Sequence, residues 1–419
     1  MSVIPVLRRL SSAIATRTML LGVAVGFGGL CWLGRITAGQ SHLTHFVRFT
    51  EWTSPETNYY PTVGEMMATV RARMQPGQIL VIVGGNSILR GAGQPAGQVW
   101  TQRLQTELGV GYGVFNFAFD GSGITDGGAV VAEALRREYP RQVYIANAAP
   151  GQPPAPDGTG VYRFMFWEAY YKGLLIADPA RAAAIEASNE NLPVRNPPGE
   201  PSLQELRTRE WLDQFCYFQD LWNRVTYKDL NLVWGFYMRD GLQFLRARKR
   251  YADPEPDSTT FPLDKRYNPS NLAIELANVR GCSQFAYMSF SAAGNPQMRK
   301  DASGRWPLYR PFWDQFVAGI RTAMPDELKP RTLVLLSRSS PYYIRRLSAD
   351  ERERDDLTYR HGVEVWKAEG YDAMDYGSDF NDDDYGDRTH LTRLGGAKLA
   401  RQVADKVRAM AGALHYTRP

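Results

Sequence analysis

The chain has 419 residues, of which 44% are hydrophobic and 22% are charged. This composition is typical of globular proteins with a large core and argues against a disordered chain. The 49 Lys and Arg residues outnumber the 44 Asp and Glu residues, but five of the arginines precede the first acidic residue, Glu51. The rest of the chain is close to neutral and carries no basic stripe, which argues against nucleic-acid binding.

The N-terminus has the pattern of an export signal. Met19 to Gly34 contains no charged residue, and Arg8, Arg9 and Arg17 precede it. We therefore expect residues 1–40 to form a cytoplasmic n-region and a transmembrane signal anchor. The protein would then be a single-pass protein of the inner (cytoplasmic) membrane, with the rest of the chain periplasmic or extracellular. A cleavable signal peptide, with its cleavage site near residues 37–39, is the alternative.

The cysteines and acidic residues do not form a metal-site motif. In an exported chain Cys216 and Cys282 are able to pair in one disulfide, and buried free thiols fit the sequence equally well. Residues 381–387 (NDDDYGD) are acidic, and we expect a solvated loop there rather than a calcium site. Since a phosphate-binding glycine loop is also absent from the sequence, we expect no metal or organic cofactor.

Short β-branched runs followed by glycines or polar loops recur along the chain. They cover residues 78–85 (QILVIVGG), 114–119 (VFNFAF), 142–147 (QVYIAN) and 332–337 (TLVLLS). Helical stretches separate some of these runs, as at residues 128–137. This alternation predicts an α/β fold with a parallel sheet and helices on both of its faces.

A helix is predicted to close the chain. Its apolar stripe recurs every three to five residues and comprises Leu391, Leu394, Leu399, Val403, Val407 and Met410. Thr392 is the predicted N-cap of this helix. His390 then belongs to the loop that leads into the helix.

Residues 151–320 differ from their surroundings, with Pro-rich loops and segments dense in aromatic residues. We interpret them as a helical insertion. It would divide the exported domain into a first part, residues 41–150, and a second part, residues 321–419. The aromatic side chains are expected mainly in the core of the insertion, and a lid or membrane-facing platform is the alternative.

Three residues combine into a candidate site for nucleophilic catalysis. Ser87 follows a predicted strand in GGNSILRG, where a hydroxyl would stand at the carboxyl edge of the sheet. His390 has a carboxylate, Asp387, three residues before it, so that one loop supplies a base and the group that orients it. The other four histidines are expected to be structural or solvated; they are His42, His45, His361 and His415.

These residues resemble the four sequence blocks of the SGNH (GDSL-type) hydrolase superfamily. Gly85, Asn86, Ser87 and Ile88 match the first block, with Asn in place of the usual Asp. The other matches are Asn116 with Gly121 for the second block, Asn147 for the third, and Asp387, His390, Leu391 and Gly395 for the last. The α/β-hydrolase elbow, Gly-x-Ser-x-Gly, fits less well because Leu89 occupies its last position.

The resemblance implies a flavodoxin-like three-layer sandwich and an acyl-enzyme mechanism. Ser87, His390 and Asp387 would be catalytic, and the oxyanion would be bound by Ser87 N–H, Gly121 N–H and the Asn147 amide. It implies a membrane-anchored serine O-acyl esterase or acyltransferase acting on a cell-envelope or exopolysaccharide substrate, with a multi-spanning membrane acyltransferase as a possible partner. A non-catalytic envelope binding or assembly protein on the same fold and a lipase-like esterase are the alternatives.

Overall fold

The computed structural model describes residues 15–26, 29, 48, 51–54, 57–59, 63–154, 165, 166, 169, 170, 173–176 and 255–416. Within these residues no helix is both long enough and apolar enough to span a membrane. The N-terminal membrane helix expected from the sequence therefore stays a prediction.

A parallel sheet of five strands forms the centre of the fold, in the order β4-β3-β5-β8-β9. The strands are β3 Ile79–Val83, β4 Tyr112–Asn116, β5 Gln142–Ala148, β8 Thr332–Ser337 and β9 Asp372–Tyr376. All four neighbouring pairs are parallel. In chain order the arrangement is 2-1-3-4-5, the order of flavodoxin-like sheets. The predicted α/β class with a parallel sheet is confirmed.

Both faces of the sheet are buried, which explains why its strands are continuously apolar. In β3 every residue is buried; Ile79, Val81 and Val83 point to one face, and Leu80 and Ile82 point to the other. The two faces belong to two separate apolar clusters. The continuous apolar runs of this sheet are thus stable because both of their faces are covered.

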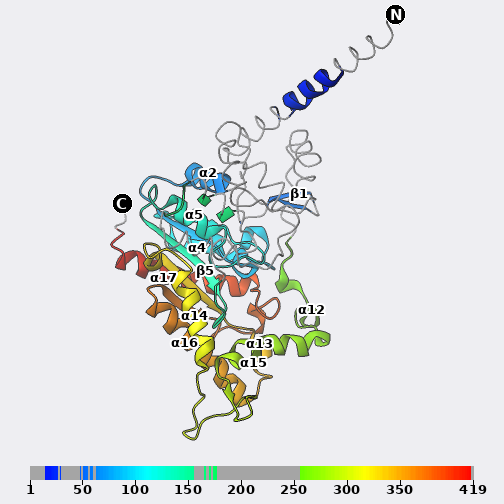
Figure 1. Ribbon diagram of the computed structural model, residues 1–419, viewed down its shortest axis with the longest axis vertical. Coiled ribbons are helices and arrows are strands. Elements are labelled where there is room, and N and C mark those ends of the chain that lie inside the picture. The colour runs from blue at the N-terminus through cyan, green and yellow to red at the C-terminus, as the bar shows by residue number, and fades with distance from the viewer. Residues whose placement is uncertain are drawn as a thin grey trace, which may run out of the picture.

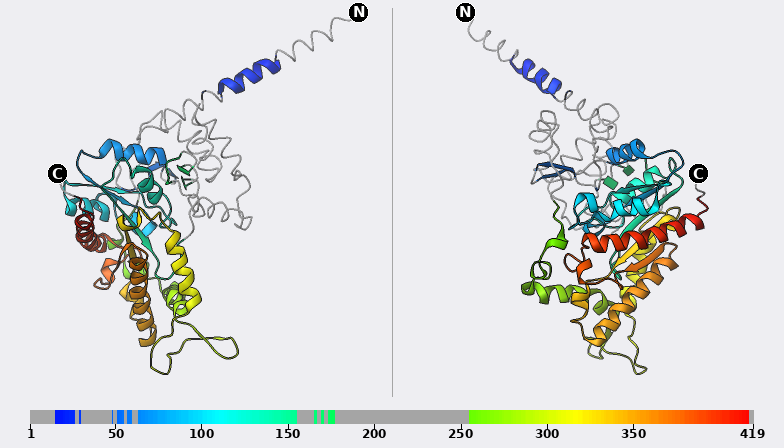
Figure 2. Two further views of the ribbon diagram at one scale, coloured as in Figure 1. Left: turned by 60° about the vertical axis from the view of Figure 1, so that its left-hand side comes forward. Right: turned by 180° about the vertical axis from the view of Figure 1, so that it is seen from behind.

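Helices form a layer on each face. One layer contains α2 Val63–Arg73, α5 Gly128–Leu135, α14 Arg310–Thr322 and α16 Ala349–Ala368; the other contains α3 Ser87–Arg90, α4 Trp100–Leu108, α15 Pro341–Ile344 and α17 Arg393–Ala413. Figure 1 shows α14 and α16 on the near side of the sheet. Seen from behind, α17 (red) runs across the opposite face, as the right-hand view of Figure 2 shows.

The closing helix α17 begins as the sequence predicts. The Thr392 hydroxyl accepts hydrogen bonds from the N–H groups of Leu394 and Gly395, so it caps the helix. Leu399 is fully buried, but the side chain of Leu394 is 44% exposed, so its place in the apolar stripe was predicted wrongly. Leu391 is buried before the helix starts, in an isolated bridge with Tyr385.

The described part of residues 151–320 includes the helix α13 Leu272–Ala286 and all but the last two residues of α14. Trp313, Phe316 and Ile320 of α14 are buried in the core of the sheet. Cys282 lies on α13, and burial raises the pKa of its thiol above the usual range. Cys216 lies outside the described residues, so the choice between a disulfide and free thiols stays open.

Smaller elements complete the described chain. They are the antiparallel pairs β1 Glu51–Ser54 with β2 Thr57–Tyr59 and β6 Ser289–Phe290 with β7 Pro296–Gln297, the short helix α12 Leu263–Arg266, and 3-10 turns at residues 96–98, 258–260, 269–271, 329–331 and 382–384.

Candidate active site

The predicted site residues follow the carboxyl ends of several strands. Ser87 comes four residues after the end of β3, Asn147 is the next-to-last residue of β5, and the loop of Asp387 and His390 follows β9. Since parallel strands present their carboxyl ends at one edge of the sheet, this topology brings distant parts of the sequence together.

Ser87 is the first residue of α3, a helix of only four residues. Gly85 adopts a positive φ of 91°, and the Asn86 side chain caps α3 by accepting a hydrogen bond from Ile88 N–H at 3.0 Å. This tight turn from strand to helix exposes the serine at the end of the strand. Asn86, the departure from the family's first block, thus acts here as a helix cap.

A chain of two short hydrogen bonds joins the three predicted catalytic residues. Ser87 Oγ lies 2.7 Å from His390 Nε2, and His390 Nδ1 lies 2.7 Å from Asp387 Oδ2. Because a carboxylate only accepts, Nδ1 carries the proton, and the neutral Nε2 is then an acceptor for the serine hydroxyl. The geometry is that of a nucleophile, a base and an orienting carboxylate.

Backbone N–H groups hold the carboxylate in place. Asp387 Oδ1 accepts hydrogen bonds from Thr389 N–H and His390 N–H, each at 2.8 Å. Burial works to raise the pKa of Asp387, but the hydrogen bond and charge of His390, with these N–H groups, lower it overall. Asp387 is thus an anion at neutral pH.

The imidazole of His390 is tuned by charges from three elements. Burial works to lower its pKa, whereas the hydrogen bond that it donates to Asp387 and the charges of Asp387 and Asp120 raise the pKa above 6.5 overall. The Arg90 guanidinium acts in the opposite direction and lowers it. The balance favours the imidazolium form that a base must pass through.

Asn147 is fixed beside the nucleophile turn. Its side-chain Oδ1 accepts a hydrogen bond from Asn86 N–H at 3.0 Å, and the side chain is buried, with 7% of the residue exposed. Among the described residues, nothing accepts a hydrogen bond from Asn147 Nδ2, Ser87 N–H or Gly121 N–H. These three donors are the ones predicted for the oxyanion.

Asn116, from the family's second block, has a bracing role. Its Nδ2 donates to the carbonyl of Leu89 at 3.1 Å, and its Oδ1 accepts from Ala118 N–H at 3.1 Å. The buried side chain therefore ties the end of β4 to α3 and shapes the loop that leads to Gly121.

Three sets of contacts between distant segments around the site were not predicted from the sequence. Gln94 is fully buried; its Nε2 donates to the Leu391 carbonyl at 3.1 Å, which connects the loop after α3 to the residue after His390. Ser258 donates both its N–H and its hydroxyl to the Gly93 carbonyl. These partners lie 297 and 165 residues apart in the sequence, and no local pattern signals such contacts.

The third link is the buried Arg90 at the end of α3. Its Nε lies 2.6 Å from Asp120 Oδ1, and its Nη2 lies 3.0 Å from Glu255 Oε2. Asp120 directly precedes Gly121 in the chain. The only sequence signal for this link is a basic residue directly after the apolar pair Ile88 and Leu89.

Basic side chains form ion pairs with the acidic segment that precedes the site. Asp382 pairs with Arg345, Asp383 with Arg266 and Asp384 with Lys398. The prediction of a solvated loop is wrong for Asp384, which is 2% exposed and also caps its own turn by accepting from Asn381 N–H. In the part of the chain that is described, no group of three His, Cys, Asp or Glu residues is placed to bind a metal.

The remaining histidines lie away from the relay or outside the description. His361 on α16 shares a 2.7 Å hydrogen bond with the Tyr287 hydroxyl, a structural contact between α16 and α13. His415 lies at the end of the described chain with a positive φ of 55°. His42 and His45 fall outside the described residues.

Comparisons of the chain with family models, with curated proteins and with solved structures returned no significant match. The fold and the geometry of the site are therefore the basis of the functional argument.

Proposed function

We propose that the chain is a serine O-acyl esterase or acyltransferase of the SGNH type. The observation that carries this proposal is the relay from Ser87 Oγ through His390 to Asp387, with 2.7 Å at each step. The order of the residues along the chain and the loop at the carboxyl edge of the sheet support it. So does the resemblance of the four sequence blocks.

In the first half of the reaction Ser87 Oγ attacks the carbonyl carbon of an acyl ester. His390 Nε2 takes the hydroxyl proton, and Asp387 stabilises the imidazolium that forms. Collapse of the tetrahedral intermediate breaks the ester bond, and His390 returns the proton to the leaving alkoxide. The acyl group is then an ester on Ser87.

The oxyanion of the intermediate needs donors aimed at it in advance. Ser87 N–H and Gly121 N–H are backbone donors, and the Asn147 amide is a side-chain donor whose orientation is set by its bond to Asn86 N–H. Such donors lower the barrier because they need no reorganisation when the charge develops.

In the second half an acceptor hydroxyl resolves the acyl-enzyme. His390 deprotonates this hydroxyl, the acyl group moves to it, and Ser87 recovers its proton. A water acceptor makes the protein an esterase, and a sugar hydroxyl makes it an acyltransferase.

The N-terminal segment supports a place at the inner membrane. Arginines followed by an uncharged apolar run are the pattern of a signal anchor, which would leave the domain in the periplasm or outside the cell. We therefore propose a cell-envelope glycan or other exported polymer as the substrate, and a multi-spanning acyltransferase as a partner that supplies the acyl group.

The test is hydrolysis of a chromogenic acetyl ester by the full-length protein. We expect turnover that is lost in Ser87→Ala and His390→Ala variants that stay folded. A much faster reaction with long acyl chains would instead indicate a lipase-like enzyme. Equal, background rates for the parent and Ser87→Ala would indicate a non-catalytic binding protein and would contradict the proposal.

A further inference from the structure

A buried arginine connects both sides of the candidate oxyanion site. Arg90 closes α3, the helix that Ser87 opens, and only 6% of the residue is exposed. Its guanidinium contacts Asp120 Oδ1 at 2.6 Å and Glu255 Oε2 at 3.0 Å. The second oxygen of Glu255 accepts a hydrogen bond from Gly93 N–H at 2.8 Å, so the carboxylate also binds the backbone of the loop after α3.

Next to this arginine, two residues of the loop after β4 are exposed although Phe119 before them is fully buried. Asp120 and Gly121 are both exposed, and a Cβ added at Gly121 would meet no atom within 4 Å. On the other side, α3 has only one helical turn. Two backbone donors on such short segments keep a common target only if their separation is fixed. The Phe119 N–H, which donates to the Gly85 carbonyl at 2.9 Å, ties the start of the loop to the nucleophile turn. The Arg90–Asp120 pair at 2.6 Å then fixes the residue directly before Gly121.

We propose that Arg90 is a positioning residue that holds the Gly121 N–H in line with the Ser87 N–H by clamping Asp120 and Glu255. The inference rests on the proposed acyl-transfer function, since it concerns the same oxyanion site. Arg90 touches no reacting atom. It acts through the backbone of the residue that follows Asp120.

The clamp also has an electrostatic consequence for the base. The charged groups that face His390 are Asp387, Asp120 and Arg90. Asp120 raises the pKa of His390 and Arg90 lowers it, so the two charges oppose each other, with Asp120 the larger influence. Removing one partner leaves the charge of the other uncompensated, and the two single variants shift the pKa in opposite directions.

The test compares Arg90→Met and Asp120→Asn with the parent, using acetyl-ester kinetics across pH. For Arg90→Met we expect kcat to fall about 10- to 100-fold, part of the loss seen when one oxyanion donor is removed, with KM changed less than about threefold. The acid limb of kcat/KM should move to higher pH in Arg90→Met and to lower pH in Asp120→Asn. Arg90→Lys, which keeps the charge but reaches one carboxylate, should restore the limb and part of kcat.

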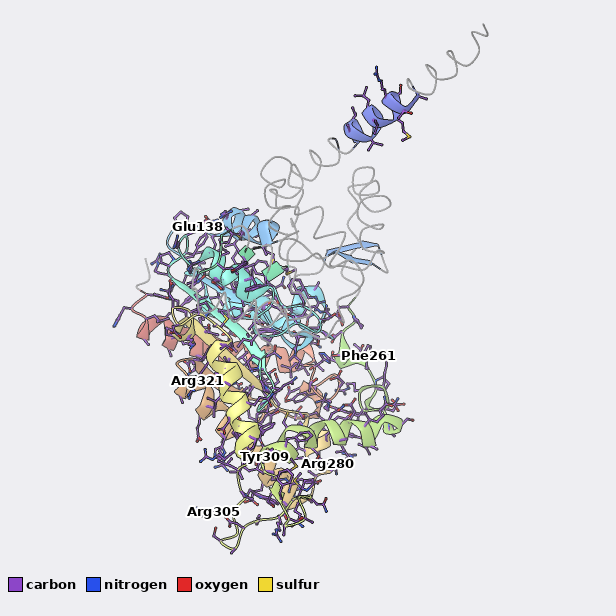
Figure 3. All side chains as sticks on the ribbon, in the orientation of Figure 1. Glu138, Phe261, Arg280, Arg305, Tyr309 and Arg321 are labelled. Atoms are coloured by element: carbon purple, nitrogen blue, oxygen red, sulfur yellow. The ribbon has the colours of Figure 1, made fainter. Side chains whose placement is uncertain are left out.

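Arg321→Met is the matched control. Arg321 lies on α14 and is labelled in Figure 3. The helices α14 and α3 cover opposite faces of the sheet. It pairs with Glu369 at 3.0 Å, so its loss removes an ion pair of similar length without touching the site. Its kcat and pH profile should equal those of the parent.

Hydrogen exchange gives a readout that does not need activity. The hydrogen-bonded backbone amides of Phe119, Ser122 and Gly123 should exchange faster in Arg90→Met and in Asp120→Asn than in the parent, while those of Arg321→Met should not change. Should Arg90→Met not fold, Asp120→Asn carries the test, because the Asp120 side chain is 47% exposed.

The outcomes of these experiments distinguish the positioning role of Arg90, which we call the clamp, from the proposed function. An active parent whose kcat and amide exchange at Phe119, Ser122 and Gly123 are unaffected by both substitutions would overturn the clamp and leave the function standing. A parent with no more activity than Ser87→Ala would overturn the proposed function, whatever the exchange results show.

Discussion

Replacing Gly85 by alanine tests how the nucleophile turn and Asn147 fit together. Gly85 has a φ of 91°, a conformation that an L-residue adopts only with strain. A Cβ at this position would overlap Asn147 Oδ1 and lie 3.1 Å from the backbone nitrogen of Asn147. The substitution therefore strains the backbone and pushes away the amide that is predicted to bind the oxyanion.

Two contributions set the expected size of the effect. The strained backbone conformation costs about 1 to 2 kcal/mol of stability, and loss of the hydrogen bond from Asn86 N–H costs about 1 kcal/mol more. Displacing one oxyanion donor lowers kcat by about a hundred- to a thousandfold. Gly85→Ala should thus lose roughly 2 to 3 kcal/mol of unfolding free energy and at least about 99% of its turnover.

Gly370→Ala is the control for the cost of backbone strain at a positive φ. Gly370 has the same φ of 91°, but a Cβ there would meet only Lys329 atoms at 3.8 and 3.9 Å. This variant should lose about 1 to 2 kcal/mol of stability and keep the kcat of the parent. Urea unfolding and acetyl-ester kinetics on both variants separate strain from catalysis.

Asn147→Ala and the double variant complete the comparison. Asn147→Ala alone should lower kcat by about a hundred- to a thousandfold. In Gly85→Ala/Asn147→Ala the overlap with Oδ1 is gone, and kcat should match that of Asn147→Ala because both changes remove the same donor. The reasoning is refuted if Gly85→Ala turns over as fast as Gly370→Ala, or if Asn147→Ala retains full activity.

Three further predictions concern charges. The pKa of His390 is raised above 6.5, and the base must be neutral to accept a proton. With an acetyl ester, kcat/KM should therefore fall as the pH drops through a value above 6.5. A fall in kcat/KM that begins only well below about pH 6 contradicts this. Asp387→Asn should lower kcat by about ten-thousandfold while substrate binding persists, and a loss under about tenfold would exclude the orienting role. Burial raises the pKa of Asp355 to about 7, so the folded protein holds a proton that the unfolded chain releases near 3.8, and stability falls as the pH rises between these values. Asp355→Asn should therefore add on the order of 4 kcal/mol to the unfolding free energy at pH 8 and little at pH 4, by urea unfolding; equal effects at both pH values contradict the reasoning.

Four strands of the sheet were predictable because each is a short apolar run that ends in a turn. The runs at residues 78–85 and 332–337 contain β3 and β8, and the run at 142–147 covers all of β5 except its last residue, Ala148. The run at 114–119 is offset, since β4 begins earlier, at Tyr112, and ends at Asn116. The fifth strand, β9, was not predicted. Its sequence, DAMDY, carries two aspartates, which an edge strand tolerates because it is only partly buried.

The predicted residues of the relay each belong to a short local pattern that can be recognised in the sequence. Ser87 directly follows a strand and a glycine pair, and Asp387 and His390 occupy one loop, so each half of the relay is a local pattern. The parallel topology alone then brings the halves to one edge. The distance of 2.7 Å between Ser87 Oγ and His390 Nε2 joins segments 303 residues apart.

The supporting contacts are different because no local pattern encodes them. Arg90 meets Glu255 across 165 residues, and Gln94 meets Leu391 across 297. A buried arginine or glutamine in a sequence looks like any other polar residue until the groups that satisfy it are known. Such contacts depend on how the segments approach each other, which only the folded chain reveals.

The most direct test of the central claim is covalent labelling of the full-length protein with a fluorophosphonate, followed by peptide mass spectrometry. The proposed relay predicts one adduct, on the peptide that contains Ser87, and its loss in Ser87→Ala and in His390→Ala. An unlabelled parent, or an adduct that persists in folded Ser87→Ala, would contradict the claim that Ser87 is an activated nucleophile.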